Sequence, residues 1–220
     1  MQENVFDHQS DRYEAWFDRN PRILDSEVEA ISQLLPSNGE GVEIGVGTGI
    51  FAARLGIRHG VEPSDAMGRR AVEKGIHVIH GIAEKLPIAD RSYSYALMVT
   101  VDCFLQDIAQ AFREVRRILS EDGCFIIAFI DRETPLGILY EQNKHRDDVY
   151  KHADFHSSDA MAAFLHEAGF DVQARRQTVF SFENVLHDVR DGCGEGVFAV
   201  IRAKTRPLAG VPDADAHAAG

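Results

Sequence analysis

The chain has 220 residues, of which 45% are hydrophobic and 26% charged, as expected for one globular domain with a substantial core. Its formal net charge of -12 argues against a nucleic-acid backbone or an anionic membrane as partner. The three cysteines, together with the lack of a long apolar run or an apolar N-terminal core, favour a cytoplasmic protein over a secreted or membrane-spanning one.

Residues 1–35 predict an N-terminal arm and a helix that form part of a lid. Tyr13 and Trp16 are aromatic residues in a polar segment with little else to bury, so we expect them to close a substrate pocket. Ser26 is a predicted N-cap, and Glu29, three residues later, completes a capping box. The predicted helix therefore begins at about residue 26 and ends before Pro36.

Residues 36–204 predict one domain in which strands and helices alternate. The expected elements are a strand from residue 41, a helix at 50–55, a strand at 57–62, a helix ending at 74, strands at 76–80 and 93–101, a helix at 108–119, a strand at 124–130 after a turn at Asp122-Gly123, a helix at 158–168, and strands at 171–180 and 196–203.

The last two predicted strands have no helix between them and form a hairpin, which makes one strand antiparallel. The predicted fold class is therefore α/β: a doubly wound, Rossmann-like, seven-stranded and mostly parallel sheet with helices on both faces. Residues 131–157 lack a clear period and predict a cover over the active site. Residues 205–220 are small and polar, which predicts a disordered tail.

The first strand leads into a glycine-rich turn that contains Gly45, Gly47 and Gly49. Glycine lets the backbone approach a ligand closely, and the helix that follows directs unpaired N–H groups into the same space. The spacing is G-x-G-x-G, whereas the dinucleotide fingerprint is G-x-G-x-x-G.

Glu43, just before the glycines, would repel a pyrophosphate but attract an ammonium or sulfonium group. Glu62 ends the second strand, where an acidic residue can bind ribose hydroxyls. These residues favour a cationic ligand with an adenosine over NAD.

Four runs together resemble class I S-adenosylmethionine-dependent methyltransferases: V-E-I-G-V-G-T-G at 42–49, G-V-E-P-S-D-A-M at 60–67, G-I-A-E-K-L-P-I-A-D at 81–90 and F-R-E-V-R-R-I-L-S-E-D-G at 112–123. The resemblance covers about residues 13–203 and is nearest to the small-molecule branch that contains quinone C-methyltransferases. It implies S-adenosylmethionine as cofactor, S-adenosylhomocysteine as product, and no metal.

The resemblance also implies a role for individual residues of the cofactor site. Glu43 would hold the methionine ammonium, and Gly45 and Gly47 would make room for the methionine and the ribose. Glu62 would bind the ribose hydroxyls. The adenine end would consist of Met67, the backbone N–H of Ala83, and Glu84. Ile82 departs from the group, which often has Asp or Asn there to receive the adenine amino group.

Ligands of such sheets lie beyond the carboxyl ends of the parallel strands, where Thr100 and Asp102 follow the fourth strand. Tyr140 and Tyr150 of the cover, with the two aromatic residues of the arm, form the predicted substrate pocket. If the acceptor must lose a proton, His156 or Asp102 is the candidate base. The alternative is that His156 meets only water and backbone.

Two further ideas concern metals and thiols. His152 and His156 are four residues apart but lack a third ligand, so we expect no metal. Cys103 and Cys193 would converge on a soft acceptor, such as arsenite or a thiol, if the loop between the last two strands lies at the ligand end. Incidental free cysteines are the alternative.

Three functions stay open on the sequence alone. The favoured one is methyl transfer from S-adenosylmethionine to a small-molecule acceptor by in-line displacement. The others are an NAD-type oxidoreductase on the same fold and a non-catalytic regulatory protein that binds S-adenosylmethionine. A homodimer is compatible with each of them.

Overall fold

The structure is a computed structural model that describes residues 10–207. The predicted arm before residue 10 and the predicted tail from residue 208 onward lie outside the described residues. Within residues 10–207, no helix is long and apolar enough to cross a membrane.

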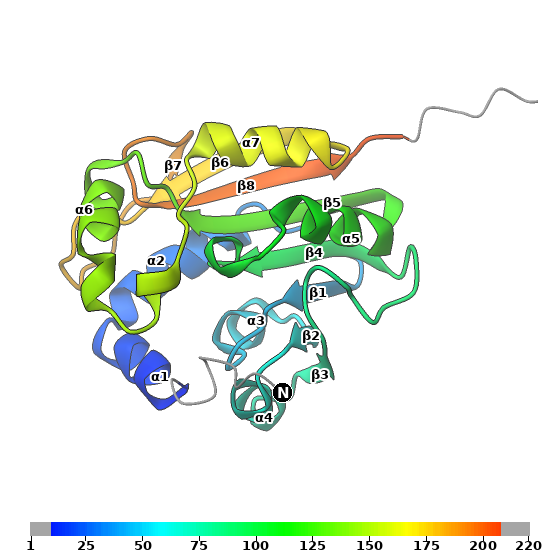
Figure 1. The fold of residues 1–220 in the computed structure, drawn as a ribbon, viewed down its shortest axis with the longest axis horizontal. Coiled ribbons are helices and arrows are strands. Elements are labelled where there is room, and N and C mark those ends of the chain that lie inside the picture. The colour runs from blue at the N-terminus through cyan, green and yellow to red at the C-terminus, as the bar shows by residue number, and fades with distance from the viewer. Residues whose placement is uncertain (1–9, 208–220) are drawn as a thin grey trace, which may run out of the picture.

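An eight-stranded sheet in the order β3-β2-β1-β4-β5-β8-β6-β7 forms the centre of the molecule (Figure 1). Its strands are β1 (Gly41–Ile44), β2 (His59–Glu62), β3 (His77–His80), β4 (Tyr93–Val99), β5 (Leu119–Ile130), β6 (Phe170–Thr178), β7 (Arg190–Asp191) and β8 (Phe198–Thr205). β1 to β5 are mutually parallel, while β8 runs antiparallel between β5 and β6. The two-residue β7 adds an eighth strand to the predicted seven, and the predicted fold class is confirmed.

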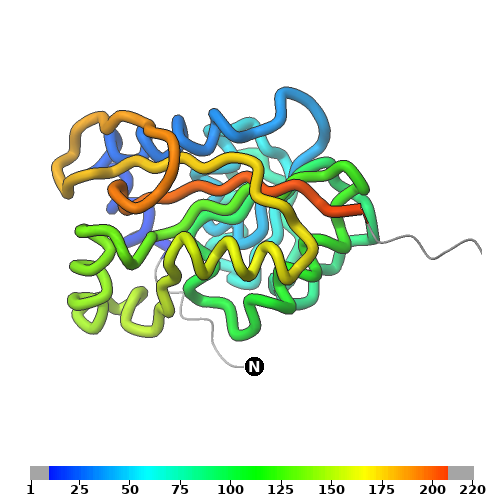
Figure 2. Tube along the Cα trace, turned by 90° about the horizontal axis from the view of Figure 1, so that it is seen from above, coloured from blue at the N-terminus to red at the C-terminus, as the bar shows by residue number. Residues whose placement is uncertain are grey.

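The helices lie on both faces of this sheet (Figure 2). They are α1 (Ser10–Arg19), α2 (Pro21–Ser32), α3 (Ile50–Leu55), α4 (Asp65–Glu73), α5 (Ile108–Ile118), α6 (Pro135–Asn143) and α7 (Ser158–Glu167). Side chains alternate along β4, so Leu97 packs in the core cluster with α1 to α4, whereas Met98 packs in the opposite cluster with α5 and α7. In Figure 1, β4 and β5 point toward α6, which places the cover at their carboxyl ends.

The predicted start of the second helix is wrong. α2 begins at Pro21, five residues before the predicted N-cap, because proline at the first helical position needs no hydrogen-bond partner for its nitrogen. Ser26 is instead buried in the helix interior, where its Oγ donates to the Arg22 carbonyl at 2.9 Å and accepts from the His187 backbone N at 2.9 Å.

Two other segments differ in the structure from their predicted conformation. The predicted turn at Asp122-Gly123 lies within β5, which begins at Leu119 directly after α5 because Leu119 pairs with Tyr93. The cover at 131–157 contains regular structure: Thr134 caps α6 by accepting from the Gly137 N at 3.0 Å. Two 3₁₀ turns follow, η3 (Lys144–Arg146) and η4 (Tyr150–His152).

Candidate functional site

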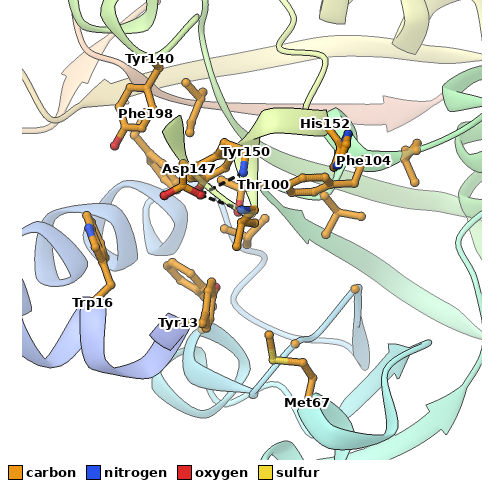
Figure 3. Close-up of a pocket in the computed structure, with 18 of the residues that line it drawn as sticks. Tyr13, Trp16, Met67, Thr100, Phe104, Tyr140, Asp147, Tyr150, His152 and Phe198 are labelled. Carbon is orange, nitrogen blue, oxygen red and sulfur yellow. Dashed lines mark hydrogen bonds between the residues drawn. The ribbon is translucent and has the colours of Figure 1, made fainter. Parts of the chain in front are cut away.

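A cavity of about 1540 Å³ opens at the carboxyl ends of β1, β2 and β4. The glycine loop and the loop after β3 line one end, and α1, α2, α6 and η4 line the other. Figure 3 shows Met67 of α4 at one end of this cavity, Tyr140 and Phe198 at the other, and Thr100 between them. Ligand pockets are usually roughly 300–1,000 Å³, so this cavity has room for two reactants.

The three glycines of the loop serve two different purposes, although all have positive φ. A Cβ on Gly47, which lines the cavity, would meet no protein atom within 4 Å. A Cβ on Gly45 would lie 2.4 Å from Val101 Cγ2, and one on Gly49 would lie 3.0 Å from Ala71. Only at Gly47 does the missing side chain leave room for a ligand, whereas the other two allow close packing within the protein.

Two carboxylates flank the loop. Glu62 lines the cavity and fastens the loop, since its Oε2 accepts from the Gly47 N at 2.8 Å and its Oε1 from the Ser64 N at 2.9 Å. Glu43 is 2% exposed and does not line the cavity. Its Oε2 has no hydrogen-bond partner within residues 10–207, and burial raises the pKa of this carboxyl well above its usual range, despite a hydrogen bond from the Ala52 backbone.

The loop after β3 brings Ala83 and Glu84 to the same end of the cavity as Met67. Glu84 is tied down, because its Oε1 accepts from the Gln106 backbone N at 2.9 Å. Ile82 also lines the cavity and is half exposed, so this position offers the cavity no polar side chain. Sequence reasoning missed Gln106, which lines the cavity beside Glu84.

Thr100 lines the centre of the cavity with a φ of 52°, a left-handed conformation that is uncommon for a residue with a side chain. Its backbone N donates to the Ala128 carbonyl at 2.8 Å, which holds the turn against β5. The next residue, Val101, packs directly against Gly45. The strained turn thus brings the ends of β1 and β4 together beneath the cavity.

Aromatic rings form the other end of the cavity. Tyr13 and Trp16 of α1 line it, as do Tyr140 of α6 and Tyr150 of η4, whose ring centroids lie 6.0 Å apart. Phe182, which sequence reasoning missed, packs 5.7 Å from the Tyr140 ring. All four predicted pocket residues therefore surround one space.

Ion pairs hold α1 against both sides of this opening. Arg12 pairs with Asp147 of the cover at 3.0 Å, while Glu14 pairs with Lys74 at 2.5 Å and with Arg70 of α4. α1 is therefore joined to the cover on one side of the opening and to α4 on the other.

The cavity also contains a carboxylate that sequence reasoning missed. Glu27 of α2 lines the cavity and is 9% exposed. No hydrogen bond or ion pair involves its side chain within the described chain, and burial raises its pKa to about 8. A signal for it existed: Glu27 follows Ile23 by one helical turn, on the apolar face of α2.

His156 and Asp102 are brought together but not to the cavity. His156 Nδ1 lies 3.1 Å from Asp102 Oδ2, and the pair joins the turn η2 (Asp102–Phe104) to the segment before α7. Burial raises the pKa of Asp102, although its hydrogen bond with His156 opposes the shift. Neither residue lines the cavity, so the predicted base does not face the space where an acceptor would lie.

The structure does not bring Cys103 and Cys193 together, and both are free cysteines, as in the alternative of incidental thiols. Cys103 is buried in the core cluster with α1 to α4, and its Sγ donates to the Thr100 carbonyl at 3.7 Å. Cys193 packs against the opposite cluster, with α5 and α7. The sheet separates the two side chains, so they cannot share an acceptor.

This fold and this site define a class of protein: a doubly wound α/β domain with a cofactor cradle where the strand order reverses between β1 and β4. A family model described as a methyltransferase domain matches residues 11–175. The chain belongs to this family and is an S-adenosylmethionine-dependent methyltransferase of class I. The predicted enzyme class is therefore confirmed, and the match is not to an oxidoreductase.

Known proteins with close similarity carry different descriptions. A Thermotoga maritima crystal structure, described as a SAM-dependent methyltransferase and possible histamine N-methyltransferase, is 41% identical, with a TM-score of 0.89 over 92% of this chain and 99% of that one. An uncharacterised Methanocaldococcus jannaschii protein is 38% identical over 91% of this chain and 98% of its own length. A malonyl-[acyl-carrier protein] O-methyltransferase of Geobacter sulfurreducens is 29% identical over 76% of this chain and 68% of its own length. None of these descriptions names a quinone C-methyltransferase.

Proposed function

We propose that the chain transfers a methyl group from S-adenosylmethionine to a small-molecule acceptor bound in the same cavity. The observation that carries this proposal is the division of one cavity of about 1540 Å³ into two chemically different ends. A glycine cradle and carboxylates form one end, and aromatic rings form the other. Methyl transfer is an in-line displacement, which requires two reactants aligned in one space.

The residues of the first end fit the cofactor. The open space at Gly47 would take the part of the cofactor nearest the backbone, and Glu62 would accept hydrogen bonds from the ribose hydroxyls. The unpartnered oxygen of Glu43 would balance the methionine ammonium, across the loop or through water. Met67 and Ala83 would cover the adenine. The bound cofactor supplies an electrophilic methyl group on a sulfonium.

The protein's own contribution is alignment and exclusion of water. Tyr13 and Trp16 reach the cavity from α1, and Tyr140 and Tyr150 reach it from the opposite side. We assign no proton transfer to His156 or Asp102, because neither lines the cavity. The open aromatic end also disfavours a regulatory protein that only binds the cofactor, since such a protein has no need of a second pocket.

The test has two steps. Isothermal titration calorimetry should give heat for S-adenosylmethionine and for S-adenosylhomocysteine but none for NAD. Mass spectrometry should then detect a methylated product from a panel that contains histamine and malonyl thioesters, the acceptor chemistries that the Thermotoga and Geobacter descriptions suggest. Absence of heat with both sulfur compounds would refute the proposal. Cofactor binding with no product from amines, carboxylates, phenols or thiols would favour the regulatory alternative.

A further inference from the structure

We propose that Glu27 binds the methyl acceptor and selects a positively charged amine, with which it pairs and from which it takes a proton before methyl transfer. This inference rests on the proposed function, because it concerns the acceptor end of the same cavity.

The position of Glu27 is unusual for a glutamate. It lies on the cavity-facing side of α2, one turn after Ile23 and two turns after Asn20, both of which also line the cavity. Its side chain is nine-tenths buried and has no hydrogen bond or ion pair within residues 10–207. A buried carboxylate without a partner is strongly unfavourable, so a ligand that supplies the partner gains affinity at this point.

Three tyrosines from three other elements line the same cavity as this carboxylate. The pKa of Tyr140 is raised to about 12, mainly by burial and to a smaller extent by the charge of Glu27. Burial and the charge of Glu27 also contribute to the raised pKa values of Tyr13 and Tyr150. These hydroxyls therefore stay neutral at physiological pH. Aromatic rings around a carboxylate form a pocket suited to an organic cation, since the ring faces attract positive charge.

Within residues 10–207, no cationic side chain pairs with Glu27. The cationic side chains that line the cavity are Arg12, Arg19 and Lys144, besides His152. Arg12 is paired with Asp147 at 3.0 Å, and Lys144 Nζ lies 2.7 Å from both Glu141 and the Ala153 carbonyl. None of the four forms an ion pair with Glu27 in the described chain, so Glu27 is open to a positive charge supplied by a ligand.

The pocket lies next to the cofactor end. Tyr13 lines the cavity, and its pKa is raised by burial and by the charges of Glu43, Glu27 and Glu62, so the same side chain is within electrostatic reach of the carboxylates at both ends. An amine paired with Glu27 would thus be near the methyl donor. A carboxylate acceptor in the same place would gain no ion pair with Glu27, whereas an ammonium would gain one, which favours the amine among the acceptor chemistries of the relatives.

The proton balance follows from this pairing. The ammonium R–NH₃⁺ gives one proton to the Glu27 carboxylate, leaving R–NH₂ with a free electron pair. That pair forms the N–C bond to the methyl group while the C–S bond breaks, and its electrons pass to sulfur. The products are R–NH₂⁺–CH₃ and the neutral thioether. Glu27 keeps the proton that it took, which restores the protonated state of the empty protein, so the one proton released in each turnover is the proton that leaves when the amine binds.

The pairing also predicts a measurable proton release. Burial raises the pKa of Glu27 to about 8, so at pH 7 most of the empty protein carries a protonated Glu27. A bound ammonium favours the charged carboxylate, so binding should release close to one proton for each amine. Calorimetry in two pH 7 buffers of different ionisation enthalpy measures this number on the S-adenosylhomocysteine complex.

The probes are 2-phenylethylamine, whose ammonium is its one titrating group, histamine, and malonate as the carboxylate probe. We expect the two amines to bind, malonate not to bind, and 2-phenylethylamine to release about one proton. Glu27→Gln should bind S-adenosylhomocysteine as the wild type does, lose at least tenfold in amine affinity and release no proton. Glu29→Gln is the matched control, because Glu29 is an exposed glutamate on the same helix and should behave as the wild type.

Several outcomes overturn the assignment. They are binding of neither amine, binding of malonate instead, or equal amine affinity in Glu27→Gln and Glu29→Gln. In each case, retained S-adenosylhomocysteine binding shows that the variant is folded and leaves the proposed function intact. If the wild type itself did not bind S-adenosylhomocysteine, the proposed function would be refuted instead.

Discussion

Replacing Gly47 by alanine separates the cost of backbone strain from the loss of cofactor space. Gly47 has a φ of 55°, and an added Cβ meets no protein atom within 4 Å. Gly56, just after α3, has a φ of 73° with the same open surroundings but does not line the cavity. The left-handed conformation costs an alanine about 1–2 kcal/mol, partly offset by about 0.4–1 kcal/mol from its stiffer unfolded chain. Both variants should therefore lose about 1 kcal/mol of stability.

That loss lowers the melting temperature by about 2–4 °C for a chain of this size. Differential scanning calorimetry should give similar shifts for Gly47→Ala and Gly56→Ala. Calorimetric titration with S-adenosylhomocysteine should then separate them: Gly56→Ala should bind as the wild type, while Gly47→Ala should lose at least tenfold in affinity, about 1.4 kcal/mol. Equal affinity in both variants would show that the cofactor does not occupy the space beside Gly47, and the reasoning would fail.

Three further predictions concern carboxylates. Glu62→Gln removes the charge that holds the Gly47 N–H and faces the ribose, so the S-adenosylhomocysteine dissociation constant should rise at least tenfold in the same titration; an unchanged value contradicts the ribose assignment. Glu114 binds Arg117 and the Leu86 N–H, which lowers its pKa, so Glu114→Gln should cost about 1–3 kcal/mol at pH 7 by urea unfolding. This difference should shrink as the pH falls below the ordinary glutamate value, where the wild type also loses the charge, and a gap that persists at low pH contradicts the reasoning. Glu27 has its pKa raised instead, so the stability of the wild type should fall as the pH rises from about 4.5 to about 8. Glu27→Gln should consequently melt above the wild type at pH 8 by at least about 2–4 °C and lose this advantage near pH 4.5, whereas an equal gap at both pH values would show that Glu27 is ionised throughout.

Local signals explain why much of the fold could be predicted from the sequence. β4 is apolar on both faces because helices cover both sides of it, and Ser64 caps α4 by accepting from the Met67 N at 3.2 Å, as its position before the helix suggests. The start of α2 was mispredicted because Ser26 and Glu29 imitate a capping box. Pro21 was the stronger signal, and beginning the helix there puts Glu27 on the apolar face instead of in an exposed first turn.

At the site, by contrast, the role of a residue depends on contacts with residues that are distant in the sequence. The glycine loop identified the cofactor cradle, but chain order gives no account of which glycine contacts protein and which contacts ligand. That distinction depends on Val101 and Ala71, which approach Gly45 and Gly49 from distant parts of the chain. The orientation of Asp102 also depends on a distant residue, because η2 turns it away from the cavity toward His156, 54 residues away along the chain.

The charges of the cavity bear on how two cationic reactants could occupy it together. A sulfonium and an ammonium held close to each other repel, and the repulsion grows as water is excluded. Glu43 and Glu62 on the cofactor side and Glu27 on the acceptor side would offset these positive charges, while Tyr13 stays neutral because its pKa is raised. Transfer of the ammonium proton to Glu27 then removes one of the two positive charges before the bond forms. The methyl group would move from a cation to a neutral amine, and the positive charge would end on the methylated amine beside a neutral Glu27, which would favour release of the product.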